Sequence, residues 1–218
     1  LLSKGPAMSP ASPTLYGSGQ VDSYSVSPSL PAGISLDTST GVITGTPTAI
    51  SSSATYTITA TNTGGTDTAT LTITVNDATP SIAFSTNSFT LTKGTAMPTT
   101  SPSSTGGAVV TWTISPAISA GLSFDSSTGT LSGTPTEVSV STVYTITATN
   151  SGGSDSATVT IVVNDIAPSS VAYSPSSFTL TKGTEMTATT PTSNGGAVTS
   201  WAVSPSLPAG LVIDSTTG

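Results

Sequence analysis

Apolar side chains occupy every second position in two pairs of stretches along the chain. The later pair places on one side Tyr144, Ile146 and Ala148, then Ala157, Val159, Ile161 and Val163. The earlier pair has the same form, with Tyr56, Ile58 and Ala60, then Ala69, Leu71, Ile73 and Val75. Alternation of this kind, rich in Val, Ile, Tyr and Thr, is typical of β-strands with one buried face. Each pair therefore predicts two long strands.

Shorter apolar runs between turn residues predict the remaining strands. In the middle of the chain we expect a broken first strand over 81–84 and 88–92, a strand over 108–114, and short strands over 121–124 and 130–132. Turn residues recur about every 8 to 12 positions, which is the spacing of a β-sandwich and not of βαβ units. No segment has a helical period. The pattern predicts an all-β protein.

The whole pattern recurs at a spacing of 88 or 89 residues. Trp112 returns as Trp201, Asn62 as Asn150, and Asp77 as Asp165, each within a similar run of neighbours. A period of this length is the size of a domain, so each repeat should bury its own core. We expect tandem β-sandwich domains in an elongated array, namely a first repeat (residues 1–77), a second repeat (78–165) and a third repeat (166–218).

The two outer repeats are expected to be incomplete. The segment Leu2 to Gly5 aligns with 91–94, so the first repeat lacks the strand that residues 82–89 provide in the second, and the third stops at Gly218 before its last strands. Half a sandwich leaves its core and its strand edges open. The sequence is therefore expected to be a window from a longer array, or to be completed by neighbouring chains through strand addition.

Three aromatic residues stand at equivalent places in the three repeats. They are Tyr24, Trp112 and Trp201, and they alternate in phase with the apolar residues Val26, Ile114 and Val203. A large aromatic side chain in a central strand is the usual anchor of a sandwich core. We predict that these three residues are core positions.

A turn with an aspartate and a glycine recurs after each aromatic position. The aspartate can accept backbone N–H groups in an Asx turn, and the glycine supplies the left-handed conformation. Calcium takes about six to eight oxygen ligands, and a single turn carboxylate supplies far fewer. A structural role for the aspartate is therefore favoured. The predicted turn residues are Asp37, Gly41, Asp125, Gly129, Asp214 and Gly218.

Composition then excludes most kinds of function. The chain has three lysines and no arginine, histidine or cysteine, so a Ser-His-Asp triad, a cysteine nucleophile and a Cys/His zinc site are impossible within it. A net charge of -7 without a basic patch disfavours nucleic acids and anionic membranes. No apolar run approaches the roughly 20 residues of a membrane helix. We expect no catalysis, no nucleic-acid partner and no membrane insertion in this segment.

The run from Leu30 to Thr48 carries a family resemblance. It has the form Leu-Pro-Ala-Gly, then Asp-x-x-x-Gly, then Gly-Thr-Pro, and it recurs over 120–136 and begins again over 207–218. It resembles the immunoglobulin-like domains of bacterial surface proteins, which are relatives of cadherin-like and dystroglycan-type domains. The resemblance implies immunoglobulin/cadherin-like sandwiches in tandem. It also implies large extracellular proteins that act as adhesins, stalks or surface-layer parts.

The segments that join the repeats resemble the cadherin linker, which binds calcium between domains. Only the central Asn-Asp and the following proline match, because the first acidic position of the linker is Thr74 or Val162 here. The resemblance therefore implies at best a weak calcium site at Asn76, Asp77, Asn164 and Asp165. The alternative is that the two aspartates organise a tight linker limited by proline. No other cofactor is expected.

Threonines form outward-facing files on the predicted long strands, such as Thr57, Thr59 and Thr61. Such files occur on ice-binding proteins, but an almost uncharged sheet also needs them on its solvent face, because threonine favours strands and keeps a hydroxyl in water. The second interpretation is favoured. Lateral packing of filaments or O-glycosylation would use the same surface.

These observations predict a structural segment of a secreted or cell-surface protein, a stalk, fibre or filament component that provides extension and assembly. Enrichment in Thr, Ser, Gly and Asn with little charge is typical of bacterial and archaeal surface repeats, which favours a prokaryotic origin. The expected partners are neighbouring repeats or identical chains, and surface glycans in the alternative. That alternative is an adhesin or a carbohydrate-binding accessory module.

Overall fold

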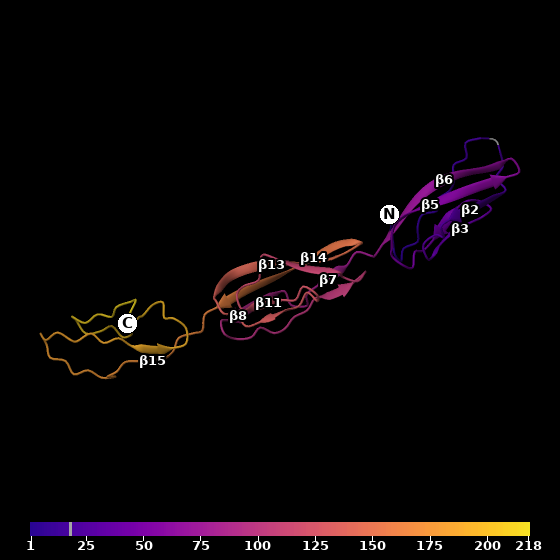
Figure 1. The fold of residues 1–218 in the computed structure, drawn as a ribbon. Coiled ribbons are helices and arrows are strands. Elements are labelled where there is room, and N and C mark those ends of the chain that lie inside the picture. The colour runs from indigo at the N-terminus through magenta and orange to yellow at the C-terminus, as the bar shows by residue number, and fades with distance from the viewer. Residues whose placement is uncertain (18) are drawn as a thin grey trace.

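The computed structural model describes residues 1–17 and 19–218, and every regular element within them is a β-strand. The repeats follow one another in a long row, from the first repeat in indigo to the third in yellow (Figure 1). The described part of the chain contains no helix of the length and apolarity needed to cross a membrane. The all-β array that the alternation predicts is confirmed.

The first repeat contains six strands and the second repeat eight. The strands of the first are β1 (Leu2–Ser3), β2 (Ser23–Ser27), β3 (Ile34–Leu36), β4 (Ile43–Gly45), β5 (Ser51–Asn62) and β6 (Gly65–Asn76). Those of the second are β7 (Ser81–Ala83), β8 (Ser88–Thr92), β9 (Ser103–Thr105), β10 (Thr111–Ser115), β11 (Leu122–Phe124), β12 (Leu131–Gly133), β13 (Ser139–Asn150) and β14 (Gly153–Asn164). The third repeat has β15 (Ser169–Ala172) and β16 (Thr192–Asn194).

A long antiparallel hairpin organises each of the first two repeats. The main sheet has the order β1-β6-β5-β2 in the first repeat and β10-β13-β14-β8 in the second. The edge strands β1 and β8 run parallel to the ends of β6 and β14, while β2 and β10 pair antiparallel on the other side. The short hairpins β3-β4 and β11-β12 form the facing layer. The figure shows both long hairpins along the upper side of the row.

The buried side chains of the second repeat are those that the alternation places inward. Tyr144, Ile146 and Ala148 on β13 are at most 2% exposed, and so are Val159, Ile161 and Val163 on β14. In the first repeat Tyr56, Ile73 and Val75 are buried as well, but Ala69 is exposed. Ala69 lies on the inward side, since it pairs with Ile58, but no strand of the described chain covers that end of β6.

Two features of the second repeat differ from the predicted strands. The broken first strand is in fact two strands in different sheets, since β7 pairs with β9 while β8 pairs with β14. The strand β9 was not predicted, because Ser103, Ser104 and Thr105 carry no apolar pattern. It forms because the edge of β7 supplies backbone partners, which needs no apolar side chain.

The third repeat has less regular structure than the other two. Its two strands pair with each other, and the remaining residues form turns and extended segments. Most of its apolar side chains stay partly exposed, and Trp201 is half-buried where Trp112 is buried. The physical reason is that the described chain holds no counterpart of β13 and β14 for this repeat.

Candidate functional site

The predicted turn aspartates are tied to the backbone of their own turns. Asp37 Oδ1 accepts the N–H groups of Ser39 and Thr40 at 2.8 and 3.0 Å, and the hydroxyl of Ser39 at 2.6 Å. Asp214 Oδ1 accepts the N–H groups of Thr216 and Thr217 and the hydroxyl of Thr216, and Asp125 Oδ1 accepts the N–H and the hydroxyl of Ser127. These bonds favour the ionised carboxylate.

The same hydrogen bonds lower the pKa values of these carboxyl groups. The side-chain bond from Ser39, followed by the backbone bonds, lowers the pKa of Asp37 to about 2. The bond from the Thr216 side chain is the largest cause of the pKa of about 2 at Asp214. The pKa of Asp125 is lowered first by the Ser127 hydroxyl. The carboxylates therefore hold the turns in their ionised form.

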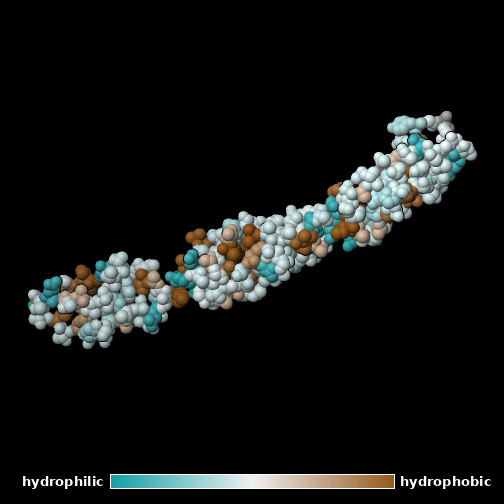
Figure 2. Space-filling view, in the orientation of Figure 1, coloured by the Kyte–Doolittle hydropathy of each residue, from teal (hydrophilic) through white to brown (hydrophobic). Residues whose placement is uncertain are grey.

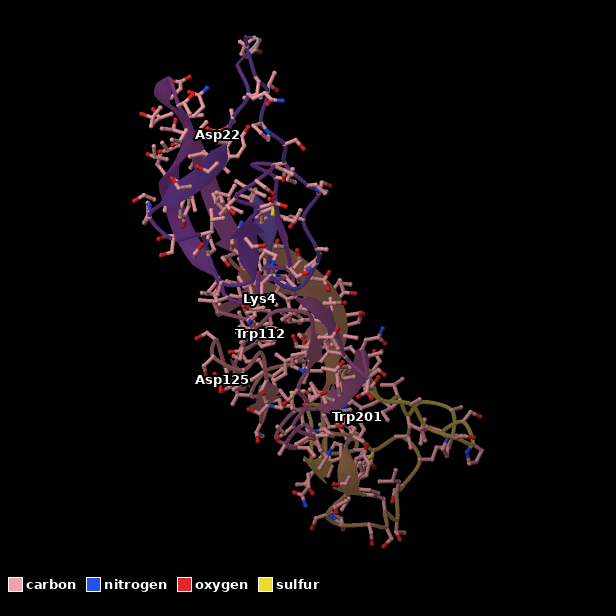
Figure 3. All side chains as sticks on the ribbon, turned by 90° about the vertical axis from the view of Figure 1, so that its right-hand side faces the viewer. Lys4, Asp22, Trp112, Asp125 and Trp201 are labelled. Carbon is pink, nitrogen blue, oxygen red and sulfur yellow. The ribbon has the colours of Figure 1, made fainter. Side chains whose placement is uncertain are left out.

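The turn glycines lie directly against the predicted core aromatics. A Cβ on Gly129 would come within 2.7 Å of the Trp112 ring, and a Cβ on Gly41 within 2.8 Å of the Tyr24 ring. Gly218 has the same relation to Trp201, at 2.9 Å. All three glycines also have positive φ values, which are 71° for Gly41, 73° for Gly129 and 80° for Gly218. Each turn thus closes over one aromatic residue. Figure 3 labels Trp112 and Asp125 of the second repeat and Trp201 of the third.

The segment that joins the first two repeats is held by the turn between β13 and β14. Asn150 Nδ2 donates to the carbonyl of Ala78 at 2.7 Å. Ser151 Oγ accepts the N–H of Asp77 at 3.0 Å, and Thr79 Oγ1 donates to the carbonyl of Gly152 at 3.0 Å. We call these three hydrogen bonds the clasp. They fix three consecutive linker residues to the second repeat.

Two glycines of the second repeat also lie close to the backbone of the linker, beside the clasp. A Cβ on Gly152 would collide with the carbonyl oxygen of Asp77, and one on Gly107 with that of Ala78. Asn150 is only 8% exposed, and its Oδ1 accepts the N–H of Gly152 at 2.8 Å. Its amide group is therefore satisfied on both sides, once within the turn and once by the linker.

Another carboxylate ties the following strand into the same region. Asp155 Oδ2 accepts the N–H of Ile82 at 2.7 Å, which joins β14 to β7. Asp67 is the equivalent residue of the first repeat, and among the described residues its one hydrogen-bond donor is the N–H of its neighbour Thr68. The two aspartates therefore have different hydrogen-bond partners, although their neighbours in the sequence are similar.

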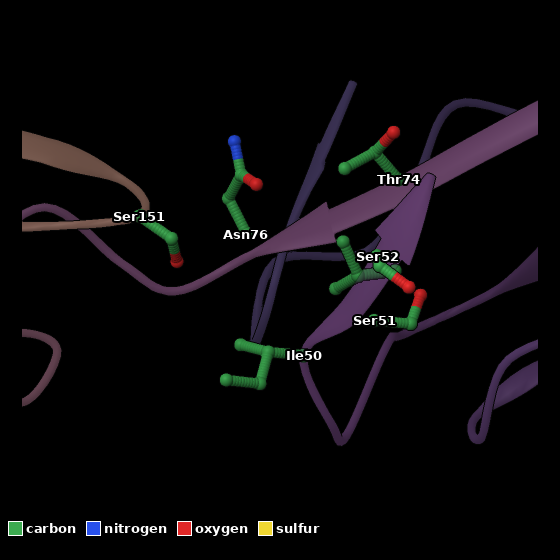
Figure 4. A pocket seen from close by; sticks show the side chains of 7 residues that line it. Ile50, Ser51, Ser52, Thr74, Asn76 and Ser151 are labelled. Atoms are coloured by element: carbon green, nitrogen blue, oxygen red, sulfur yellow. The ribbon is translucent and has the colours of Figure 1, made fainter. Parts of the chain in front are cut away.

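A small pocket of about 210 Å³ lies at the first junction. Figure 4 shows how Ser151 reaches it from the second repeat, while the other lining residues belong to the first repeat. The hydroxyl oxygen of Ser51 is buried there without a hydrogen-bond partner among the described residues, and Ser139 repeats this at the second junction. The second junction has a wider pocket of about 450 Å³, lined by residues of β13, β14 and their flanks.

The second junction has part of the same arrangement. Asp165 Oδ1 accepts the N–H of Ile166 at 2.9 Å, as Asp77 Oδ1 accepts that of Ala78 at 3.0 Å. Gly195 and Gly196 approach the carbonyls of Ala167 and Ile166 as Gly106 and Gly107 approach those of Thr79 and Ala78. The glycine side of the clasp is thus repeated within the described chain.

The four residues suggested as calcium ligands lie at these junctions. The backbone carbonyls of Asn76 and Asn164 accept the backbone N–H groups of Lys4 and Lys93, at 2.8 and 2.9 Å. Within residues 1–17 and 19–218, no three acidic side chains gather as a metal-binding group. Calcium usually takes about six to eight oxygen ligands, and the side chains at each junction supply fewer. Calcium binding stays a prediction.

The clasp residues could not be identified from the sequence. The recurrence of Asn62-Thr63-Gly64-Gly65 as Asn150-Ser151-Gly152-Gly153 is visible and indicates a turn. Nothing in that pattern shows that the asparagine reaches a carbonyl 72 residues away in the sequence. The recurring glycine pair at 106–107 and 195–196 is the remaining signal that could have pointed to close backbone contact.

Comparison with known proteins gives one family match and several structural neighbours. A family model described as "Putative Ig domain" matches residues 2–76 and 79–164. Among curated proteins no sequence match is found.

The solved structures that are similar are tandem Ig-domain proteins. Extracellular domains 3–5 of Drosophila OTK are 21% identical, with a TM-score of 0.38, over 62% of this chain and 47% of that one. The insect immune protein hemolin is 19% identical, with a TM-score of 0.42, over 75% and 44%. The titin fragment I67-I69 is 15% identical, with a TM-score of 0.37, over 96% and 78%. The chain thus spans less than half of the OTK and hemolin structures.

Proposed function

Because the chain belongs to this family of Ig-like domains, with two matched copies in tandem, we propose that it is a structural segment of a secreted or cell-surface protein. In this proposal it acts as a stiff spacer, within a stalk or fibre of prokaryotic origin. The repeats of 1–77, 78–165 and 166–218 are the units of the spacer. Composition supports a role without catalysis, since the chain has no histidine, cysteine or arginine.

The clasp is the observation that carries this proposal. A flexible linker between domains is solvated, and it makes few contacts with either side. Residues 77, 78 and 79 instead each hydrogen-bond the turn of the second repeat. The linker is therefore fixed to the second repeat. Since β6 ends at Asn76, directly before Asp77, little free chain is left between the two repeats, and they are expected to keep one relative orientation.

Small-angle X-ray scattering of the whole chain tests the spacer. We expect a rod-like profile whose largest dimension matches the extended row. The double variant Asn150→Ala/Ser151→Ala removes two clasp bonds and should broaden the distribution of largest dimensions. The matched control is Asn62→Ala/Thr63→Ala in the first repeat, where Asn62 Nδ2 donates to Gln20 and not to a linker. A compact parent, or a parent as flexible as the clasp variant, would contradict the proposal.

Calcium offers another way to stiffen the junction, and it can be tested separately. If the clasp alone holds the junction, adding calcium or a chelator leaves both the scattering profile and the melting temperature unchanged. A calcium-dependent rise in melting temperature that Asp77→Ala removes would instead assign the junction to the metal.

The glycan-binding alternative has less support. Carbohydrate sites commonly use exposed aromatic rings, which offer an apolar face beside polar groups. Two aromatic residues in the described chain are exposed. They are Tyr16 in the first repeat and Phe178 in the third. They lie in different repeats and do not form a common surface.

A further inference from the structure

Three rows of hydroxyl side chains cross the outer face of each main sheet. In the first repeat the strand register aligns three rows across β2, β5 and β6: Ser27, Thr57 and Thr70; Ser25, Thr59 and Thr68; Ser23, Thr61 and Thr66. In the second repeat the rows across β10, β13 and β14 are Ser115, Thr145 and Thr158; Thr113, Thr147 and Ser156; Thr111, Thr149 and Ser154. We call each set of nine a hydroxyl lattice.

None of the residues in either hydroxyl lattice is buried, and no charged residue interrupts them. The acidic residues of these strands, Asp67 and Asp155, pair with Ala60 and Ala148 and so belong to the opposite face. The chain as a whole carries a net charge of -7, which therefore lies elsewhere. In Figure 2 most of the visible surface is white, the colour of side chains of intermediate hydropathy.

From this arrangement we propose that the hydroxyl lattices are a lateral docking surface for a second copy of this chain. The proposal goes beyond the spacer, which needs no lateral partner. Two faces without charge approach each other without electrostatic repulsion, whereas the charged remainder of a chain at -7 repels a copy of itself. The uncharged face is thus where two copies meet most easily.

The shape of the face also favours a second copy. Strands of a sheet are rotated from one another by about 20 to 25°, so a three-strand face is twisted and not flat. A twisted sheet face packs well on another with the same twist. A flat crystalline surface, such as ice or an ordered glucan, would touch only part of the lattice. Copies joined through these faces would wind around each other.

The size of the face explains why the lattice must be repeated. With strands about 4.8 Å apart and residues about 3.4 Å apart, one hydroxyl lattice covers roughly 240 Å². Two lattices give about 500 Å² for each partner and roughly 1,000 Å² in total, which is near the lower limit for a specific interface. A single repeat falls below this limit. Association should therefore strengthen steeply with the number of repeats.

One pair of hydroxyl groups within the second lattice already forms a hydrogen bond. Thr147 and Ser156 lie on neighbouring strands, and their hydroxyl oxygens are 2.8 Å apart. A hydroxyl that has a neighbour of this kind loses less on leaving water, because one of its bonds is kept. Methyl groups of the threonines then remain available for contact with the partner.

A charge exchange at the centres of the two lattices tests the proposal on the whole chain. We expect sedimentation velocity of the parent to show a mass that rises with concentration up to about 1 mM, and scattering to show a thicker cross-section. The variants Thr59→Lys/Thr147→Lys and Thr59→Glu/Thr147→Glu should each lose at least about tenfold in association, since like charges then face each other. An equal mixture of the two variants should associate again.

The matched control is Thr38→Lys/Ser126→Lys, which adds the same charges at equivalent exposed turn positions outside the lattices. It should associate like the parent, and circular dichroism should confirm that every variant is folded. A parent that stays monomeric, a mixture that stays monomeric while the parent associates, or growth in length without growth in cross-section would each overturn the proposal. The proposal would also be overturned if the parent stayed monomeric and bound to ice or to a neutral glucan, and if the lysine substitutions abolished that binding. None of these results would alter the rod length that tests the spacer.

Discussion

The first and second repeats have the same long hairpin, but the hairpin of the second is better covered. Ile146 and Ala148 on β13 are fully buried, whereas the equivalent Ile58 and Ala60 on β5 are only half-buried. Asn150 at the turn is 8% exposed, and Asn62 is more open. Near-identical strands thus end in different environments.

The strand β7 and the residue Phe84 account for this difference. In the second repeat Ile82 of β7 belongs to the buried core, and Phe84 packs against it. Among the described residues, the core of the first repeat has no equivalent of either one. The outer half of the hairpin therefore depends on a strand from the beginning of its own repeat. The alternation along the hairpin fixes which side faces inward, but not whether anything covers that side.

The largest expected effect is at the covered isoleucine. Ile146→Ala should destabilise the second repeat by about 4 kcal/mol, because it empties a fully buried site, and Ile58→Ala should destabilise the first by about 2 kcal/mol. Hydrogen exchange of the amides of β13 and β5 measures each repeat separately. Equal losses at the two sites would show that β7 does not make the second hairpin more deeply buried than the first.

The turn glycines should behave alike in both repeats, since each lies on its aromatic ring. Gly129→Ala and Gly41→Ala should each cost about 2 to 3 kcal/mol, from the positive φ together with a collision of the Cβ with the ring. Gly94→Ala is the control, because its φ is 79° but nothing lies within 4 Å of a Cβ there, and it should cost about 1 kcal/mol. Denaturant unfolding of the parent and the three variants makes the measurement. If the control costs as much as Gly129→Ala, the ring contact contributes nothing.

The equivalent aspartates on β14 and β6 should differ sharply. Asp155→Ala leaves the N–H of Ile82 without its partner and should cost about 1 to 2 kcal/mol. Asp67→Ala removes only a bond to the next residue on an exposed strand and should stay within about 0.5 kcal/mol. Thermal unfolding of the two single variants checks this prediction. A cost at Asp67 as large as that at Asp155 would show that β7 is not what distinguishes the two repeats.

The smallest effect is a loss of stability in acid that both repeats share. The folded pKa of Asp37 is about 2, below the ordinary value of 3.8, so the ionised turn stabilises the fold at any pH above 3.8. This contribution is lost as the pH falls from 3.8 towards 2. We expect the melting temperature to fall over that window, and to fall less in the variant Asp37→Asn. An unchanged slope in the variant would remove this carboxylate as a cause.

Much of the fold could be predicted because it is encoded by neighbours along the chain. Alternation in β13 and β14 gives two long strands with one buried face, and the Asp-x-x-x-Gly spacing gives the turns. The strand β9 could not be predicted, because its three hydroxyl residues form a strand only in answer to β7.

The candidate site was less accessible to sequence analysis, because its parts are distant in the chain. The contact of Gly129 with Trp112 joins two features that the sequence presents separately. Asn150 could be identified as a turn residue, but its bond to Ala78 depends on where the fold brings the linker. Likewise the alternation shows that threonines face outward, whereas their alignment in rows needs the register of three strands.

The parallel pairing of β8 with β14 has a mechanical consequence for a chain that is pulled at both ends. Five consecutive residues, Ser88 to Thr92, lie beside Thr160 to Asn164, and β14 is the strand by which the chain leaves the second repeat. Tension along the row would slide these two strands past each other. Their hydrogen bonds would then resist together in shear and not open one at a time from an end.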